Sequence, residues 1–416
     1  MKLMKRSLIG MSSLGMLVAL AGPAFAEVTL RLSIWDANQK PALDQITARF
    51  SEENPDIKVS IEVVPRSDYV TKLETSIVGR NAPDVFWNAL PDRFLELARS
   101  GLIENLDERI KADGVDLSPI APALLEAFTY EGSLYAIPKD FDTVGLWYNK
   151  ALFDAAGVAY PDDSWTWETL RENAKKLTNP SKGVYGFVVN AGTRAGYYNF
   201  IAQNAGDVLT DDLKSGFDQP ETAAAVQFMA DLILVDKVSP TVQQTEEVNA
   251  QTRFKTGQAA MILDGSWRAR EFADDPYTLE NANIAVLPQG TVRASSSGTL
   301  GYSIYSGSEH KEEAWDLLKF LASPEAAQIQ ASAGAVIPSH MDQAQIWVDA
   351  IPQFNLQAFL DMVDYAEVVA HSFNTPGWSS IMNQELKKAL AGDVSVDEAT
   401  SLVATKMNEV LASEGK

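Results

Sequence analysis

The stretch "AIPKDFDTVGLWYNKALFDAAG", residues 136–157, decides how the fold is interpreted. Its pattern is that of an apolar strand leading into a helix. That strand nevertheless contains Pro138, the carboxylates of Asp140 and Asp142, and the pair Trp147 and Tyr148. Our hypothesis for this polarity is that the chain crosses here from one lobe of the molecule to another, and that a small molecule is held at the crossing.

The segments before this stretch alternate between strand and helix. "VTLRLSI" (28–34) and "IKVSIEVV" (57–64) carry apolar residues at alternate positions, the period of a strand with one buried face. Helical spacing fills "PALDQITARFSEENP" (41–55) and "SDYVTKLETSIVGR" (67–80), and "DVFW" (84–87) begins a third strand. Short connections between such elements indicate right-handed crossovers and a parallel sheet.

Ligands of parallel sheets bind just outside the carboxyl ends of the strands. Here those ends carry aromatic and hydrogen-bonding residues, without an obvious nucleophile and base: Trp35, Asp36, Asn38 and Gln39 after the first strand, Arg66 and Ser67 after the second, Trp87 and Asn88 after the third. For Trp35 two interpretations stay open, a wall of the pocket or a core residue beneath the loop.

The segments after the crossing predict a second set of elements. A helix capped by Thr166 is expected in 164–180, and "GVYGFVV" (183–189) is typical of a strand. A loop with Arg194 and the pair Tyr197 and Tyr198 follows, and "AAMILDGSW" (259–267) indicates a return strand ending at Trp267. The Gly- and Ser-rich "VRASSSGTLG" (292–301), which includes Gly298, suits a second crossing between lobes.

The ends and the composition of the chain point to an exported protein. The first 26 residues carry three basic and no acidic residues, then an apolar run and the small residues "AFA", which predicts a cleaved signal peptide at 1–26. The apolar run, 8–21, is shorter than the roughly 20 residues of a membrane-spanning helix. Cleavage would leave 390 of the 416 residues, enough for two domains, and would move the formal net charge from −22 to −25.

Charge and cysteine content narrow the class of partner. A chain this acidic is not expected to bind nucleic acid or anionic membrane surfaces. Repulsion between negatively charged copies of the chain also favours a monomer. The chain has no cysteine, so it is expected to fold without disulfides and to carry no lipid on an N-terminal cysteine. We therefore expect a protein free in the periplasm, without direct membrane anchoring.

Six landmarks occur in one order along nearly the whole mature chain. They are "RNAPDVFW", "GSLYAIPKDFDTVGLWYNKALFDAAG", "SWTWETL", "FKTGQAAMILDGSW", "IAVLPQG" and "SEHKEEAWDLLKFLAS". Together they resemble family 1 of the extracellular solute-binding proteins of ABC sugar importers, the group that includes the maltose-binding protein. Their strength lies in order and spacing.

The resemblance implies a type II periplasmic-binding-protein fold of class α/β. Each lobe would be a mainly parallel sheet flanked by helices, with the ligand in the interlobe cleft. The N-terminal lobe would comprise 27–140 plus 296–337, and the C-terminal lobe 141–295 plus 338–416. The implied partners are a carbohydrate ligand and the membrane permease subunits of the transporter, and no cofactor is implied.

The resemblance also implies which residues face the ligand. Trp87, Trp267 and Trp378 lie at positions similar to aromatic sugar platforms, since an indole stacks on the C–H face of a pyranose. Asp142 and Asp264 could accept sugar hydroxyls, although Asp264 could instead cap the turn before Gly265. The predicted ligand-binding set is Trp35, Asp36, Asn38, Gln39, Arg66, Trp87, Asn88, Asp140, Asp142, Arg194, Tyr197, Tyr198, Asp264, Trp267, Gly298 and Trp378.

Two other functions stay open at this point. The importer role could serve a polyol or an anionic sugar derivative, such as a glycosyl phosphodiester or a sulfonated sugar, bound by Arg66, Arg93, Arg194 or Arg268. An exported carbohydrate-active enzyme would need a pair of carboxylates about 5–10 Å apart in the cleft. The three histidines lack metal-ligand spacing, and phosphate-binding glycine loops and G-x-S-x-G elbows are missing. We therefore expect no metal, no catalysis and a purely binding role.

Overall fold

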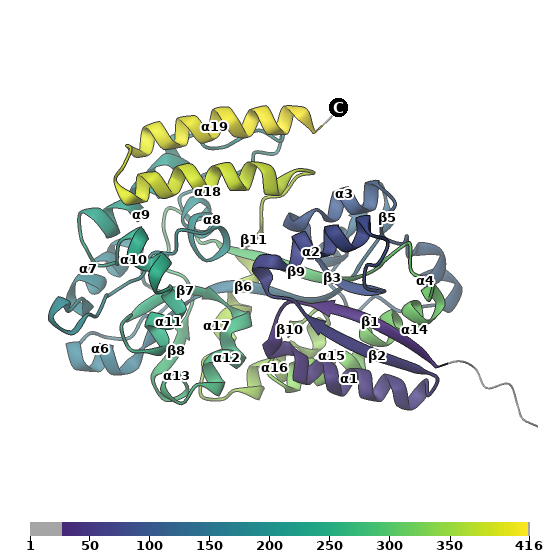
Figure 1. Cartoon of the computed structure of the whole chain (residues 1–416). Coiled ribbons are helices and arrows are strands. Elements are labelled where there is room, and N and C mark those ends of the chain that lie inside the picture. Colours follow the sequence, from purple (N-terminus) through teal and green to yellow (C-terminus); the bar gives the residue numbers. More distant parts are fainter. Residues whose placement is uncertain (1–26, 415–416) are drawn as a thin grey trace, which may run out of the picture.

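The computed structural model describes residues 27–414, so the predicted signal peptide lies outside the described residues. Two groups of helices lie side by side, and the long strands β6 (Ile137–Asn149) and β9 (Ser295–Ile304) run between them (Figure 1). The quoted stretch 136–157 is thus β6 with α6 (Lys150–Ala156) behind it. It occupies the middle of the molecule.

The first strands form the parallel sheet that their alternation predicts. β1 (Val28–Ile34) pairs in parallel with β2 (Ile57–Val63) and with β3 (Val85–Ala89). Leu30, Leu32 and Ile34 of β1 are fully buried. The carboxyl ends of these strands therefore open at one edge, as expected for a binding site of this fold.

β6 belongs to two sets of strand pairs. Up to Thr143 it pairs with β9, and from Val144 onward with β7 (Met261–Gly265) and β8 (Ala282–Ala285). The pairing with β9 shifts register between Pro138 and Asp140, and proline has no amide hydrogen with which to continue a ladder.

The pairings of β6 and β9 also change the character of the sheet. β6 is antiparallel to β7, β8, β9 and β10 (Ile337–Pro338), and β3 is antiparallel to β9. β11 (Ala366–Val368) joins β9 in parallel, and β4 (Thr129–Tyr130) with β5 (Ser133–Leu134) forms a separate hairpin. The expectation of mainly parallel sheets is corrected to a mixed sheet, because the strands that cross between the lobes run against their neighbours.

The helices cover both ends of this sheet. Those beside β1 to β3 are α1 (Lys40–Glu53), α2 (Arg66–Val78), α3 (Phe94–Arg99), α4 (Asp107–Asp113), α5 (Pro122–Glu126), α14 (Lys311–Leu321) and α15 (Pro324–Ser332). The others are α7 (Trp167–Leu177), α8 (Tyr198–Gln203), α9 (Pro220–Leu234), α10 (Val242–Glu247), α11 (Ala250–Lys255), α12 (Ala269–Asp274), α13 (Pro276–Asn281), α16 (Ala344–Ala350), α17 (Gln357–Asp361), α18 (Thr375–Ala391) and α19 (Val396–Ser413).

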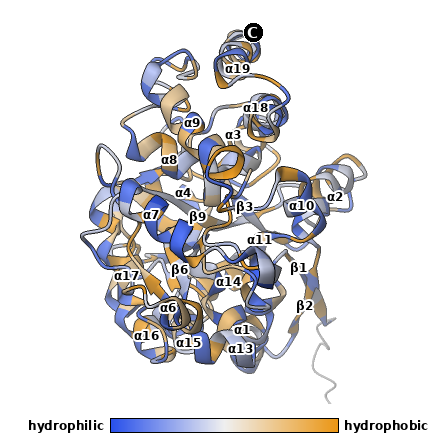
Figure 2. Cartoon of the chain, turned by 90° about the vertical axis from the view of Figure 1, so that its left-hand side faces the viewer, coloured by the Kyte–Doolittle hydropathy of each residue, from blue (hydrophilic) through white to orange (hydrophobic). Residues whose placement is uncertain are grey.

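Helix α7 shows why these sequences form helices. The Thr166 side chain accepts a hydrogen bond from the amide of Thr169, the cap that the sequence predicts. Leu170, Ala174 and Leu177 recur at helical spacing and are buried. The remaining face of α7 is hydrophilic and lies at the outside of the molecule (Figure 2).

The strand expected at 183–189 forms only isolated bridges, at Val184, Tyr185 and Val188. The amide of Gly186 donates instead to the Thr178 hydroxyl at 3.0 Å, and the amide of Val189 donates to the Ser239 hydroxyl at 3.0 Å. These side-chain acceptors replace ladder partners, so the prediction of a regular strand was wrong here.

Candidate ligand-binding cleft

A cavity of about 380 Å³ opens where β1, β6, β9 and the segment after β7 meet. Ten of the predicted residues line it: Trp35, Asp36, Asn38, Gln39, Arg66, Asp140, Asp142, Arg194, Trp267 and Gly298. Apart from Arg194, which lies in the helical segment Thr193–Tyr197, they come from the segments that follow strands and from the crossing strands, as the sequence predicted for a ligand site.

Trp35 forms the aromatic wall on the side of β1. Its ring packs edge-on against Tyr69 at 4.8 Å and against Trp87 at 5.1 Å between centroids. The guanidinium of Arg66 lies 5.0 Å from the centroid of Trp35. Trp87 is fully buried behind Trp35. Of the two interpretations of Trp35, the structure therefore favours the pocket wall.

A chain of hydrogen bonds forms the floor beside Trp35. The carboxylate of Asp36 accepts from the amide of Asn38 at 3.0 Å and from Nε2 of Gln39 at 3.1 Å. Oε1 of Gln39 accepts from Nζ of Lys139 at 2.9 Å, and Lys139 also forms an ion pair with Asp140. The amide of Leu300 donates to Oδ1 of Asp140 at 3.0 Å. The cleft surface of Gln39 and Asp140 is thus held in a fixed orientation.

Asp142, Arg194 and Gly298 meet at the point where β6 and β9 cross. Asp142 pairs with Arg194 and accepts from the amide of Gly298 at 3.0 Å. The Arg194 guanidinium lies against Gly298, where an added Cβ would be 3.0 Å away, and 4.7 Å from the ring centroid of Trp267. Glycine therefore provides the space in which a cation from one element covers the indole of another.

The carboxyl groups of Asp140 and Asp142 in β6 are buried, and each has a cation and a backbone amide as partners. Burial raises the pKa of Asp140 and of Asp142, while Lys139 and Arg194 act in the opposite direction. Their carboxylates are engaged by a side-chain cation and a backbone amide each. Such groups position neighbouring side chains at the cleft.

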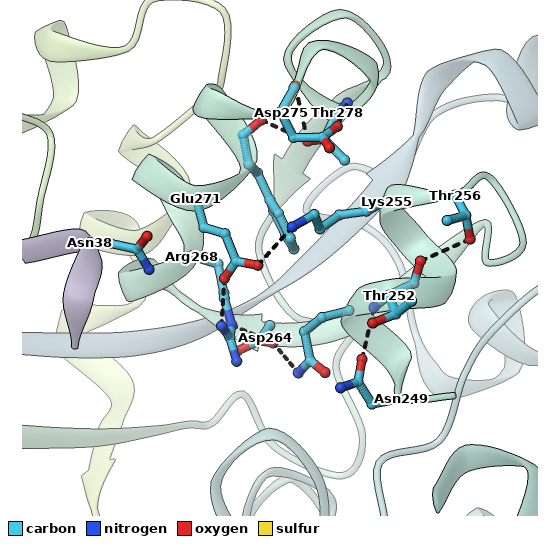
Figure 3. A network of polar contacts seen from close by, with 12 residues as sticks. Asn38, Asn249, Thr252, Lys255, Thr256, Asp264, Arg268, Glu271, Asp275 and Thr278 are labelled. Atoms are coloured by element: carbon cyan, nitrogen blue, oxygen red, sulfur yellow. Dashed lines mark hydrogen bonds and ion pairs between the residues drawn. The ribbon is translucent and has the colours of Figure 1, made fainter. Parts of the chain in front are cut away.

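Arg268 follows Trp267 and anchors a second polar cluster (Figure 3). Its Nε donates to Asp264 at 3.2 Å and its Nη1 to Glu271 at 2.6 Å. Asp264 also accepts from Gln251 at 2.6 Å, and Glu271 from Lys255 at 3.1 Å. The carboxylate of Asp264, followed by Glu271, raises the pKa of the guanidinium.

Six predicted ligand residues do not line the cavity. Trp87 and Asn88 lie in β3, with Asn88 donating to the Ser303 hydroxyl at 3.3 Å across the sheet. Asp264 is buried and supports Arg268 in place of a ligand hydroxyl. The expectation that these three line the cavity is corrected, because Trp87 packs behind Trp35, Asp264 is bound by Arg268, and Asn88 is buried within the sheet.

The remaining three belong to the core on the side of α9 and α18. Tyr197 is fully buried, and Tyr198 lines a separate, smaller cavity with Asp207 and Glu367. Trp378, in the first turn of α18, is also fully buried and donates its indole hydrogen to the Ser372 hydroxyl at 2.8 Å. The platform expected at Trp378 is thus corrected to a core position, since both its ring and its donor are occupied by the protein.

Sequence reasoning missed several residues of the site. Ser266 precedes Trp267 in "GSWR" and lines the cavity, so its position next to Trp267 was the available signal; Arg268, which was named only for an anionic solute, also lines the cavity. Lys139 stands within the quoted stretch 136–157 but was not assigned a role. The apolar lining residues, among them Leu90, Phe141, Val336 and Val369, carried no signal that distinguishes them from core residues.

The fold and this site define a two-lobed solute-binding protein. More particularly, the chain belongs to the bacterial extracellular solute-binding protein family, whose pattern matches residues 36–328. The predicted family, the type II fold and the solute-binding class are thereby confirmed. None of the helices in residues 27–414 combines the length and apolar character needed to cross a membrane.

Known proteins resemble nearly the whole chain. A binding protein of Brucella abortus (strain 2308) is 24% identical over 413 residues, which covers 95% of this chain and 96% of the relative. The maltotriose-binding protein of Pyrococcus abyssi is 28% identical over 317 residues, covering 71% of this chain and 63% of that protein. A solved ABC substrate-binding protein from Listeria monocytogenes, in complex with cycloalternan, superposes with a TM-score of 0.87 at 29% identity, covering 93% and 99% of the two chains.

Proposed function

We propose that this protein captures a neutral carbohydrate by closing its two lobes and delivers it to the membrane permease of an ABC importer. It acts in the periplasm, as a monomer without membrane anchor, after removal of residues 1–26. The lobes are 27–140 plus 296–337 and 141–295 plus 338–416. The permease role is supported by the family and by the ABC substrate-binding protein that resembles the chain.

The balance of charge in the cleft carries the choice of a neutral solute. The cavity is lined by three arginines and three aspartates: Arg66, Arg194, Arg268, Asp36, Asp140 and Asp142. Arg194 and Arg268 are paired with carboxylates. A site for an anion would need positive charge that its own carboxylates do not compensate.

The remaining surface suits a sugar. Trp35 and Trp267 offer aromatic area, and Asn38, Gln39 and Ser266 offer hydrogen-bonding groups. A relative that covers 71% of this chain is named for maltotriose. Closure about β6 and β9 would remove water from the hydroxyls and replace it with these groups, because an unmatched buried partner costs about 1–3 kcal/mol.

The same pairing argues for binding without catalysis. Glycoside hydrolysis needs one carboxyl as acid and another as base or nucleophile. Asp140 and Asp142 are instead engaged by Lys139 and Arg194 and by the amides of Leu300 and Gly298. Incubation with oligosaccharides should release no new reducing ends, and their appearance at a rate abolished by Asp142→Asn would contradict a binding role.

The first test is a thermal-melt screen of the mature protein against neutral sugars, polyols, and phosphorylated or sulfonated sugars at millimolar concentration. A ligand at about a thousand times its Kd adds roughly 4 kcal/mol to the folded state and raises Tm by several degrees. We expect hits among the neutral sugars. Hits confined to the anionic compounds would overturn the neutral class. No shift with any compound, after refolding to remove bound ligand, would overturn the carbohydrate assignment.

A further inference from the structure

Arg268 is held more firmly than a solvent-exposed arginine would be. Its Nε and Nη1 are bound by Asp264 and Glu271, which come from the end of β7 and from α12. Asp264 is 1% exposed and is itself fixed by Gln251 and by the amide of Gly265 at 2.8 Å. Each carboxylate is therefore anchored independently of Arg268, and the orientation of the guanidinium is set before any solute arrives.

The ion pairs leave one end of the guanidinium available. Nη2 of Arg268 has no hydrogen-bond partner among residues 27–414, while Nε and Nη1 are engaged. Arg268 lines the cavity beside Trp267. Asn38, from the opposite lobe, lies across from Arg268 and Glu271 with no bond joining them (Figure 3).

The charge of the cluster defines what this end can bind. Arg268 and Lys255 carry two positive charges, and Asp264 and Glu271 carry two negative ones. The cluster is locally neutral, so it offers a directed hydrogen-bond donor without excess positive charge. Hydroxyl oxygens of a neutral sugar are suitable acceptors for such a donor.

We propose that Arg268 is a specificity-determining residue, whose Nη2 donates to a hydroxyl of the neutral sugar at the edge of Trp267, with Asn38 contacting the same sugar from the other lobe. This inference rests on the proposed function. The hydroxyl remains an acceptor in the complex, so a solute that lacks it loses the contact.

The test uses calorimetry with the sugar identified by the thermal screen. Arg268→Gln should raise Kd roughly tenfold or more, because a hydrogen bond to a charged group is lost. Arg270→Gln is the matched control, since Arg270 pairs with Asp274 on the same helix and does not line the cavity. Its Kd should stay within about twofold of wild type.

Deoxy analogues of that sugar separate direct contact from indirect effects. One analogue should bind the wild type more weakly by about the same factor, roughly tenfold, and should lose nothing further in Arg268→Gln. If the loss of affinity caused by each deoxy analogue simply added to the loss caused by Arg268→Gln, the proposed contact would be overturned. Wild-type affinity in Arg268→Gln would overturn it as well.

A second variant guards against misfolding. Arg268→Lys keeps the positive charge next to Asp264 and Glu271, so it should melt like the wild type, yet it lacks the planar fork and should still bind several-fold more weakly. If Arg268→Lys bound the sugar with wild-type affinity, and if the losses from deoxy analogues added to the loss from Arg268→Gln, only the positive charge at this position would matter. The proposed hydrogen bond from Nη2 would then be overturned. Failure of the wild type to bind any sugar would refute the proposed function itself, whereas sugar binding that ignores Arg268 refutes only this inference.

Discussion

At the scale of single residues, two indoles that were both predicted to line the cleft have different surroundings. Trp35 follows a strand, is partly exposed and lines the cavity, whereas Trp378 lies in the first turn of α18 and is fully buried. The aromatic ring alone does not make a sugar platform. A free ring face does, because stacking requires that the solute reach it.

Trp35→Ala should therefore weaken sugar binding, whereas Trp378→Ala should lower the stability of the fold. Trp35→Ala should raise the Kd for the sugar about tenfold while the protein stays folded, since a cleft aromatic is removed. Trp378→Ala should lower the free energy of unfolding by about 3–5 kcal/mol and leave Kd nearly unchanged. Calorimetry and urea unfolding measure the two quantities. A folded Trp378→Ala protein with reduced affinity for the sugar would indicate that Trp378 contacts the solute in the cleft.

A second prediction at this scale concerns the pair of Arg194 and Asp142. Arg194→Ala leaves Asp142 buried without its cation and should cost about 3 kcal/mol of stability at neutral pH. Burial already raises the pKa of Asp142, and losing Arg194 raises it further. The folded pKa then lies above the unfolded one, so the cost is present at high pH and disappears as pH falls through the folded value.

Thermal melts of the Arg194→Ala variant across pH check this sign. The deficit relative to wild type should shrink toward acid pH, and Asp142→Asn in the same background should remove both the deficit and its pH dependence. A deficit that stays constant with pH would show that Arg194 acts through packing on Trp267, 4.7 Å away, and not through Asp142.

At the scale of elements, α18 and α19 are joined by a buried carboxylate. Glu385 of α18 accepts from Lys388 at 2.5 Å and from Lys406 of α19 at 2.9 Å. These hydrogen bonds from Lys388 and Lys406 lower the pKa of Glu385. The stabilisation is thus present above the unfolded pKa of about 4.3 and is lost as pH falls through the lower folded value.

Glu385→Gln should accordingly cost about 1 kcal/mol at neutral pH, a modest amount because both lysines are partly exposed and solvent screens them. The difference in Tm from wild type should be largest above about pH 5 and should shrink as pH falls below the unfolded pKa and through the lower folded pKa. Glu409→Gln, a carboxylate of α19 outside this cluster, serves as the control. A difference that grows toward acid pH would contradict the assigned direction of the pKa shift.

The elements also show what the sequence could predict. Alternation identified β1 with its bounds, and spacing plus the Thr166 cap identified α7, because both depend on neighbours in sequence. The stretch 183–189 has the same alternation, but two of its backbone amides donate to the hydroxyls of Thr178 and Ser239 instead of to a neighbouring strand. Such competition is decided by tertiary contacts that a single strand pattern does not contain.

The site follows the same division. Residues directly after strands, such as Trp35, Asp36 and Gln39, were placed in the cleft by the general rule for parallel sheets. Lys139 was not predicted, and Arg268 was predicted only as a ligand of an anionic solute, because their roles depend on partners from other elements, namely Gln39 for Lys139 and Asp264 and Glu271 for Arg268. Buried charges of this kind become visible only when the partner is known.

At the scale of the whole molecule, a neutral cleft sits in a strongly acidic protein. The chain carries 56 acidic and 34 basic residues. Its long-range field repels anions, yet the charges at the cleft itself are paired over short distances. The long-range field therefore acts on charged solutes, which it repels when they are anionic. The local ion pairs instead fix the geometry of the hydrogen-bonding groups that a neutral solute meets.

Salt separates these two effects, which leads to the last prediction. The Kd for the neutral sugar should change by less than about twofold between roughly 20 mM and 500 mM NaCl, because screening acts on net charges and the solute has none. Binding of an anionic sugar derivative would tighten with salt if the field of the acidic chain dominated, and would weaken if the arginines of the cleft dominated. Calorimetry at three or so salt concentrations, with the heat of dilution subtracted, measures this. A steep dependence for the neutral sugar would mean that closure itself brings like charges of the two lobes together, and the ion pairs of Arg194 and Arg268 would then have to rearrange in the closed state.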